Sequence, residues 1–210
     1  MCSRGGYFIE RFNVAHTDEQ QSTIDSVNES NAVFRSVVAN VQADQWDLPT
    51  VNDDWTVRGV VNHIIGGSTW TANIASGAGS DWPEGDLIGS ADPLQAHQAA
   101  HDAMLAAYAD PEAWDRTMQS PMGEMPASLV LTFRISELVH HAWDVAQATG
   151  QSTDVAPEQS QKLLDGMRDA FANFDRNDAG FQQQFKPETP VADDASAADR
   201  LAAFLGKRVQ

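Results

Sequence analysis

Glu137 and His141 are the two residues of this sequence whose types and spacing most directly suggest metal chemistry. They lie in the segment RISELVHHAWD, residues 134–144, which has the composition of a helix. Side chains four residues apart stand one above the other on the same side of a helix. A carboxylate and an imidazole presented in this way can ligate one divalent cation. We therefore take Glu137 and His141 as the first candidate ligands.

Helical projection places this pair on a polar stripe beside an apolar sector. At about 100° per residue, the stripe contains Arg134, Glu137, His141 and Asp144. The adjoining sector contains Leu131, Ile135, Leu138, Ala142 and Val145. Unpaired buried charges cost several kcal/mol, so these polar residues need partners. Asp144 or Arg134 could orient the ligands. Arg134 could also hold a carboxylate of the substrate or of the thiol, although a salt bridge to Glu137 or to another carboxylate of the bundle is the plainer reading, which we slightly prefer.

His63 supplies the expected third ligand. It lies at the centre of an apolar stripe in an earlier predicted helix, between Val60 and Gly67. A set of two histidines and one glutamate leaves a coordination position open, as catalytic zinc sites do. Gly66 and Gly67 follow His63 by one turn, and glycine inside a helix costs about 1 kcal/mol relative to alanine. The two glycines make room either for a ligand beside the metal or for close helix packing.

Other histidines offer weaker candidates. His97 and His101 are also four residues apart, but we expect them to be hydrogen-bonded packing residues rather than ligands. His140 projects beyond the polar stripe and is expected to be exposed. His16 precedes the first predicted helix and is expected to be inert. The sequence contains no G-x-S-x-G, P-loop or dinucleotide-binding motif that would indicate another chemistry.

Composition narrows the class of protein. The chain has 210 residues with a formal net charge of -17, which disfavours binding to nucleic acid or to an anionic membrane. No apolar run approaches the ~18 residues that span a bilayer, and residues 1–13 lack a signal-peptide pattern. The single cysteine, Cys2, excludes an intramolecular disulfide and fits a reducing compartment. We expect a cytoplasmic protein.

Proline, glycine and capping residues divide the chain into helix-length segments. We expect helices over residues 18–41, 57–75, 93–109, 127–149 and 157–174, a helical turn over 111–117, and a last short helix from Ser196. We find no convincing strand pattern. The expected organisation is an N-terminal extension over 1–16, a metal-binding bundle over 17–176, and an extended segment with a short helix packed on the bundle over 177–210. The predicted fold class is all-α, a four-helix bundle with extra short terminal helices.

Two motifs resemble those of DinB-like metal-binding proteins, and more narrowly the mycothiol-dependent maleylpyruvate isomerase metal-binding domain. The first comprises WTVR at residues 55–58 with VNHIIGG at 61–67, and the second is ELVHHAWDVAQATG at 137–150. The segment VADDASAADRLAAFLG, residues 191–206, is similar to the end of the same subfamily. The resemblance covers residues 17–206. One departure is Asn52 in the segment PTVN, where relatives often carry a cysteine.

The resemblance implies an up-down-down-up bundle that binds a divalent metal, most readily Zn²⁺ with Ni²⁺ or Fe²⁺ as alternatives. The implied ligands map onto His63, Glu137 and His141. It also implies mycothiol or a similar low-molecular-weight thiol as cosubstrate, which attacks a small electrophile in a transfer or an isomerisation. A non-catalytic metal-binding or sensor bundle is the alternative, and a plain structural bundle with a buried ion-pair network is a third reading. The sequence leaves the substrate and the oligomeric state, a homodimer included, open.

Overall fold

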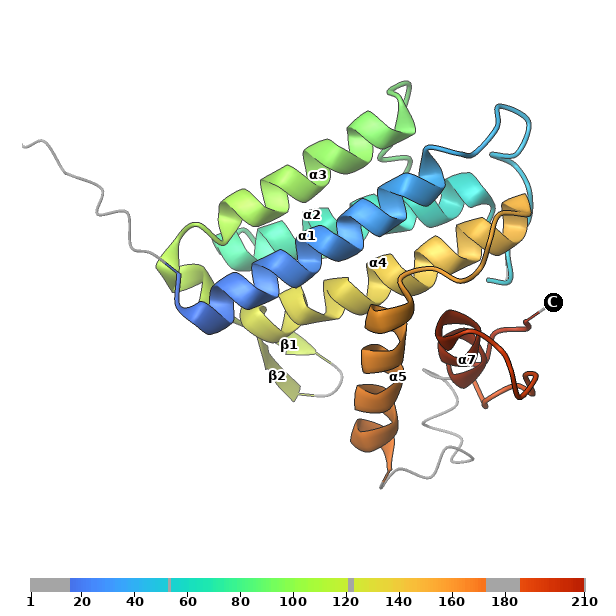
Figure 1. Ribbon diagram of the computed structural model, residues 1–210. Coiled ribbons are helices and arrows are strands. Elements are labelled where there is room, and N and C mark those ends of the chain that lie inside the picture. The colour runs from blue at the N-terminus through green and yellow to red at the C-terminus, as the bar shows by residue number, and fades with distance from the viewer. Residues whose placement is uncertain (1–15, 53, 121–122, 173–185, 210) are drawn as a thin grey trace, which may run out of the picture.

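The computed structural model describes residues 16–52, 54–120, 123–172 and 186–209, and most of them are helical. Four long helices form the body of the molecule (Figure 1): α1 (Asp18–Val38), α2 (Val57–Ser76), α3 (Pro93–Ala107) and α4 (Ala127–Thr149). In Figure 1, α1 and α4 run in one direction and α2 and α3 in the other, which is the predicted up-down-down-up arrangement. Helix α1 packs on α4, and α2 packs on both α3 and α4.

The ends of these helices follow from local chemistry. Thr17 and Gln20 form a reciprocal capping box at the start of α1, and the Thr56 side chain accepts from the Gly59 N–H at the start of α2. Asp92 caps α3 by accepting from the Gln95 N–H. Helix α4 ends at Gly150, whose φ of 71° is the left-handed conformation that glycine adopts without strain. Of the two helices of the candidate site, α2 thus has a capped start and α4 a glycine-capped end.

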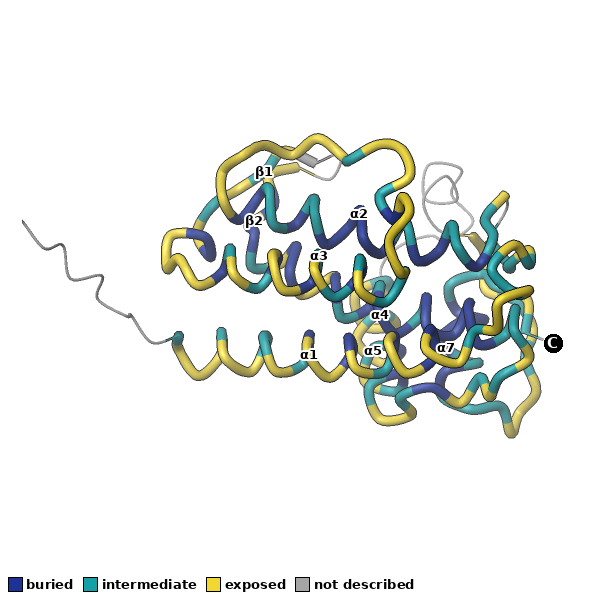
Figure 2. The backbone as a smooth tube through the Cα atoms, turned by 90° about the horizontal axis from the view of Figure 1, so that it is seen from above, coloured by how far each residue is buried: buried dark blue, intermediate teal, exposed yellow. Residues whose placement is uncertain are grey.

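The core lies along the inward faces of the four helices, as the buried segments in Figure 2 show. Among its fully buried side chains are Phe34, Ile64, Leu131 and Trp143. Full burial of such a side chain contributes about 1.5–3 kcal/mol. No helix in the described part of the chain is both long and apolar enough to cross a membrane.

Two further helices lie beside the bundle, α5 (Pro157–Phe171) and α7 (Ala197–Phe204). Figure 1 shows α5 crossing the direction of the long helices, with α7 next to it. A small second core, made of Val139, Leu164, Leu201 and Phe204, joins α5 and α7 to the back of α4. This contact brings the C-terminal segment against the helix that carries Glu137 and His141.

The structure corrects the sequence-based reading in one element and several boundaries. The expectation of no strand is wrong, because β1 (Thr117–Ser120) and β2 (Gly123–Pro126) form a short antiparallel hairpin. Four-residue strands are too short for an alternating pattern to be recognised. The turn before them is a 3₁₀-helix over Pro111–Asp115. Helix α1 ends at Val38 rather than at 41, and α3 at Ala107 rather than at 109. The N-terminal extension, apart from His16, and residues 173–185 lie outside the described residues.

Candidate metal centre

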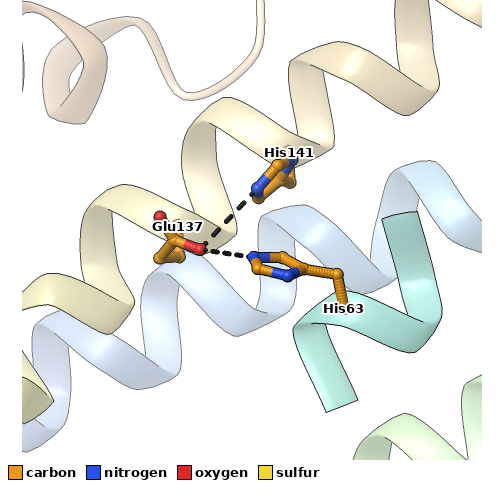
Figure 3. A group of neighbouring side chains, drawn as sticks. All are labelled: His63, Glu137 and His141. Carbon is orange, nitrogen blue, oxygen red and sulfur yellow. Dashed lines mark hydrogen bonds and ion pairs between the residues drawn. The ribbon is translucent and has the colours of Figure 1, made fainter. Parts of the chain in front are cut away.

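The three predicted ligands lie together at the contact between α2 and α4 (Figure 3). His63 Nε2 is 2.9 Å from Glu137 Oε2, and His141 Nε2 is 3.7 Å from the same oxygen. One ligand atom from each residue lies within 4.8 Å of the other two. Figure 3 shows both imidazole rings turned toward the Glu137 carboxylate, with α1 passing behind them.

This arrangement fits a divalent metal ion. Two neutral imidazoles and one carboxylate form a donor set used at catalytic zinc sites. Ligand atoms that lie about 3 to 4 Å apart can share an ion placed about 2.0–2.2 Å from each. The side chains of His63 and Glu137 retain 22% and 31% of their exposure, so one side of the group is open to solvent. The donor set is therefore incomplete on its exposed side, where a further ligand can approach.

A buried hydrogen-bond network orients His141. Its Nδ1 lies 2.7 Å from Oδ2 of Asp144, which leaves Nε2 directed at the centre. The fully buried Asp144 also accepts from Asn52 Nδ2 at 2.7 Å and from Lys207 Nζ at 2.7 Å. Burial would raise the pKa of Asp144, but Lys207 and His141 together hold it below its usual value. An ionised carboxylate behind a ligating histidine fixes the ring and increases its basicity.

Glu137 lies in a positive environment. Burial would raise its pKa, but the His63 hydrogen bond and the positive charge of Arg134 help to hold it well below its usual value. His140 Nε2 is 3.7 Å from Oε1, and Arg134 Nη1 is 3.9 Å from Oε2. Burial in turn lowers the pKa of His141, which therefore favours the neutral form that binds metals. These shifts favour the ionised carboxylate and the neutral imidazole, which are the forms that bind metal ions.

Arg134 is inside the bundle rather than at the mouth of the site. It is 3% exposed, and its Nη2 donates to the backbone oxygen of Ile64 at 3.0 Å. A Cβ added to Gly67 would overlap the guanidinium, so the glycine makes room for this arginine. Of the two readings of this glycine, close helix packing is therefore the one that the contacts support, and Arg134 is placed to pair with Glu137.

Tryptophan rings border the site. The Trp55 ring lies 4.6 Å from the His63 ring and 5.8 Å from that of His141. Trp82, from the loop between α2 and α3, stacks on His63 at 5.2 Å with 23° between the planes. Gly66 lies beneath it, because a Cβ there would stand 3.1 Å from the Trp82 ring. The open coordination side is therefore bordered by aromatic surface.

The structure also shows the surroundings of three histidines outside the candidate ligand set, His97, His101 and His140. His97 and His101 are buried and bonded to Asn31 and Asn28, as expected for packing residues. The expected exposure of His140 is wrong, because its side chain is only 12% exposed. Helical projection considers one helix alone, whereas the C-terminal segment that carries Lys207 covers this side of α4.

Sequence reasoning missed Asn52, Lys207, Trp55 and Trp82 as parts of the site. The departure of Asn52 from the pattern of the resembling family is the one available signal for that residue. Lys207 lies 63 residues from its partner Asp144, and no local pattern connects them. Trp55 belongs to one of the two motifs but has no role assigned by it, and its position beside His63 follows from tertiary packing.

Comparison with known proteins identifies the family and the relatives of this chain. Residues 27–146 match the model of the mycothiol maleylpyruvate isomerase N-terminal domain. The chain is 33% identical over 180 residues to the uncharacterized proteins MT0763 and Rv0738 of two Mycobacterium tuberculosis strains. Each match covers 84% of this chain and 93% of the relative.

Two solved structures share the fold. Both are crystal structures of mycothiol-dependent maleylpyruvate isomerase, one of them of a mutant with a histidine replaced by alanine, with TM-scores of 0.55. The alignments cover 69% of this chain and 67% of the solved chains, at 14% and 15% identity, so they support the fold alone. The family match extends over the helices that carry His63, Glu137 and His141. The chain belongs to the mycothiol maleylpyruvate isomerase N-terminal domain family.

Proposed function

We propose that this protein is a thiol-dependent S-transferase or isomerase of the cytoplasm, with a divalent metal ion held by His63, Glu137 and His141. The observation that carries the proposal is the placement of three ligand atoms within 4.8 Å of one another, with one side open to solvent. Family membership supports mycothiol or a similar low-molecular-weight thiol as the cosubstrate.

The donor set favours Zn²⁺, with Ni²⁺ or Fe²⁺ as alternatives, because imidazole and carboxylate suit each of these ions. The chemistry supplied by such an ion when bound is Lewis acidity, which lowers the pKa of a ligating thiol. The chain's own residues prepare the site. Asp144 holds the His141 ring through Nδ1, and Arg134 keeps a positive charge beside Glu137.

The reaction uses the electron pair of the thiolate sulfur. In a transfer, that pair forms a carbon–sulfur bond, and the leaving group departs with the pair of the bond that breaks. In an isomerisation, the sulfur adds to a carbon–carbon double bond conjugated to a carbonyl group, and the displaced π pair moves onto the carbonyl oxygen. The substrate then rotates about the resulting single bond, and the returning pair re-forms the double bond and expels the sulfur as thiolate. The thiol proton passes to water at the exposed side of Glu137, and in an isomerisation the thiol is regenerated.

The buried position of Arg134 bears on how a substrate is held. Its guanidinium is engaged by Ile64 and Glu137 inside the bundle. A substrate carboxylate would have to displace these contacts to pair with it. We therefore assign Arg134 to the positioning of Glu137 and not to the binding of the electrophile.

The test is thiol-dependent consumption of an electrophile such as monobromobimane by the zinc-loaded protein. We expect His63→Ala to abolish the protein-catalysed rate and to lower the bound zinc below one ion per chain. The exposed Lys162→Gln serves as the matched control and should retain both. Equal rates for wild type and His63→Ala would contradict the proposed thiol-dependent catalytic activity. If wild type binds one metal ion per chain but neither it nor the variants show a thiol-dependent rate, the result would instead support a non-catalytic metal-binding or sensor bundle.

A further inference from the structure

The two candidate histidine ligands are held in place by different kinds of contact. Nδ1 of His141 is bonded to the buried carboxylate of Asp144, so this ring is fixed through the nitrogen that does not ligate. His63 is bonded to Glu137 through Nε2, which is the ligand atom itself. No residue in the described part of the chain forms a hydrogen bond with His63 Nδ1. When an ion takes Nε2, no described side chain therefore fixes the His63 ring by hydrogen bonding.

Two tryptophan rings contact the His63 ring, one from each direction along α2. The Trp55 ring lies 4.6 Å from it and the Trp82 ring 5.2 Å, with 39° and 23° between the planes. Trp55 stands at the level of Gly59, one turn before His63, because a Cβ added to that glycine would lie 3.7 Å from the Trp55 Cβ. Trp82 stands at the level of Gly66, one turn after His63, where an added Cβ would lie 3.1 Å from the indole. An indole therefore flanks the imidazole on each side.

The loop that carries Trp82 is fastened to α2, the helix that carries the histidine. On one side of Trp82 in the sequence, the Ser80 oxygen accepts from Trp70 Nε1 at 2.7 Å. On the other side, the Leu87 N–H donates to Asn62 Oδ1 at 2.7 Å. One face of the Trp82 indole is thus held against the imidazole, and the 44% exposure of this residue belongs to the opposite face. The loop supports the ring contact before any ligand arrives.

We propose that Trp82 is a positioning residue of the metal centre: its indole, with that of Trp55 on the other side, holds the His63 ring in the orientation that metal binding requires. This inference rests on the metal centre of the proposed function but does not depend on the thiol reaction. An imidazole that ligates a divalent cation loses electron density, and the electron-rich face of an indole attracts an electron-poor ring. The indoles thus do for His63 what Asp144 does for His141.

Zinc titration calorimetry of Trp82→Leu and Trp82→Phe tests this role. Leucine keeps apolar bulk over Gly66 but has no ring, whereas phenylalanine keeps an aromatic face. An aromatic contact typically changes an equilibrium constant about three- to tenfold. We expect Trp82→Leu to weaken zinc binding by about this factor, and Trp82→Phe to stay within about twofold of wild type. Both variants should unfold in urea at similar concentrations, because the side chain lies in a partly exposed loop.

Nuclear magnetic resonance of the metal-free protein gives a readout that does not depend on zinc. Protons above the face of an aromatic ring resonate upfield, and those of the His63 ring can be identified by their loss in His63→Ala. We expect them upfield of the ring protons of an exposed histidine in wild type. Trp82→Leu should move them downfield, and Trp82→Phe should move them less. Unchanged His63 resonances in Trp82→Leu would contradict the ring contact.

The outcomes separate this inference from the proposed function. One zinc ion per chain with equal affinity in wild type and Trp82→Leu, or an equal loss in Trp82→Leu and Trp82→Phe, would overturn the positioning role and leave the metal centre standing. No zinc binding by wild type would overturn both. The expected pattern of zinc affinities in a protein without a thiol-dependent rate would support the positioning role and contradict only the catalytic activity.

Discussion

Lys207 Nζ lies 2.7 Å from Oδ1 and 2.8 Å from Oδ2 of Asp144, although the two residues are 63 positions apart. Asp144 in turn accepts from His141 Nδ1. The C-terminal segment therefore reaches the candidate metal centre through two consecutive polar contacts. Because Asp144 is fully buried, Lys207 is the main charge that balances it. The lysine consequently helps to determine where His141 points.

Lys207→Gln should weaken zinc binding. Residues that orient a ligand through a hydrogen bond typically change metal affinity 10- to 100-fold when they are removed, and we expect about tenfold here. Removing one partner of a buried ion pair also costs about 3–5 kcal/mol of stability. Zinc titration calorimetry and urea unfolding measure the two effects. Lys162→Gln removes the same charge from an exposed position of α5 and should change neither quantity. A tenfold loss in the control as well would show a general charge effect.

Gly67→Ala should destabilise the protein by about 1–3 kcal/mol, because the added Cβ overlaps the buried Arg134 guanidinium. Gly166, inside α5, has no atom within 4 Å of its own added Cβ. Gly166→Ala should therefore stabilise by about 0.5–1 kcal/mol through helix propensity alone. Chemical unfolding of both variants measures the contrast. Similar changes of the same sign in the two variants would refute the role assigned to Gly67.

Buried histidines should make the protein less stable in mild acid. Burial lowers the pKa of His97 to about 3 and that of His101 to about 4, against 6.5 for an ordinary histidine. Above pH 6.5, both residues are neutral whether the chain is folded or unfolded. As the pH falls below 6.5, the unfolded chain binds protons that the folded chain excludes, so stability declines until about pH 4 for His101 and about pH 3 for His97.

His97→Gln isolates one of these contributions. Each such histidine changes the free energy of unfolding by up to about 1.4 kcal/mol per pH unit. We expect the stability of the variant to fall less steeply than that of wild type between pH 6 and 4.5, by about this amount per unit. Urea unfolding across this range gives the two slopes. Parallel curves would show that His97 is not excluded from protonation in the folded state.

The sequence was sufficient to predict the four long helices and the three candidate ligands. Capping residues such as Thr17 and Asp92 act on their own backbone within three residues, so their effect can be recognised locally. Glu137 and His141 are related by one helical turn, which fixes their relative positions once the helix is assigned. His63 was identified from its place in an apolar stripe, because a polar residue on a buried face requires a partner.

The parts that sequence reasoning missed depend on long-range contacts. Lys207 meets Asp144 only because α7 and the C-terminal segment pack against α4. Trp82 reaches His63 because its loop folds back onto Gly66 of α2. The burial of His140 has the same origin, since periodicity in one helix carries no information about what covers it. These features require the assembled fold.

The central claim is that His63, Glu137 and His141 hold one metal ion together. A crystal structure of the zinc-loaded protein, with the ion located by its anomalous scattering, tests it most directly. We predict one ion per chain about 2.0–2.2 Å from His63 Nε2, a Glu137 carboxylate oxygen and His141 Nε2. Absence of an ion between these atoms at saturating zinc, or an ion bound without His63, would contradict the account.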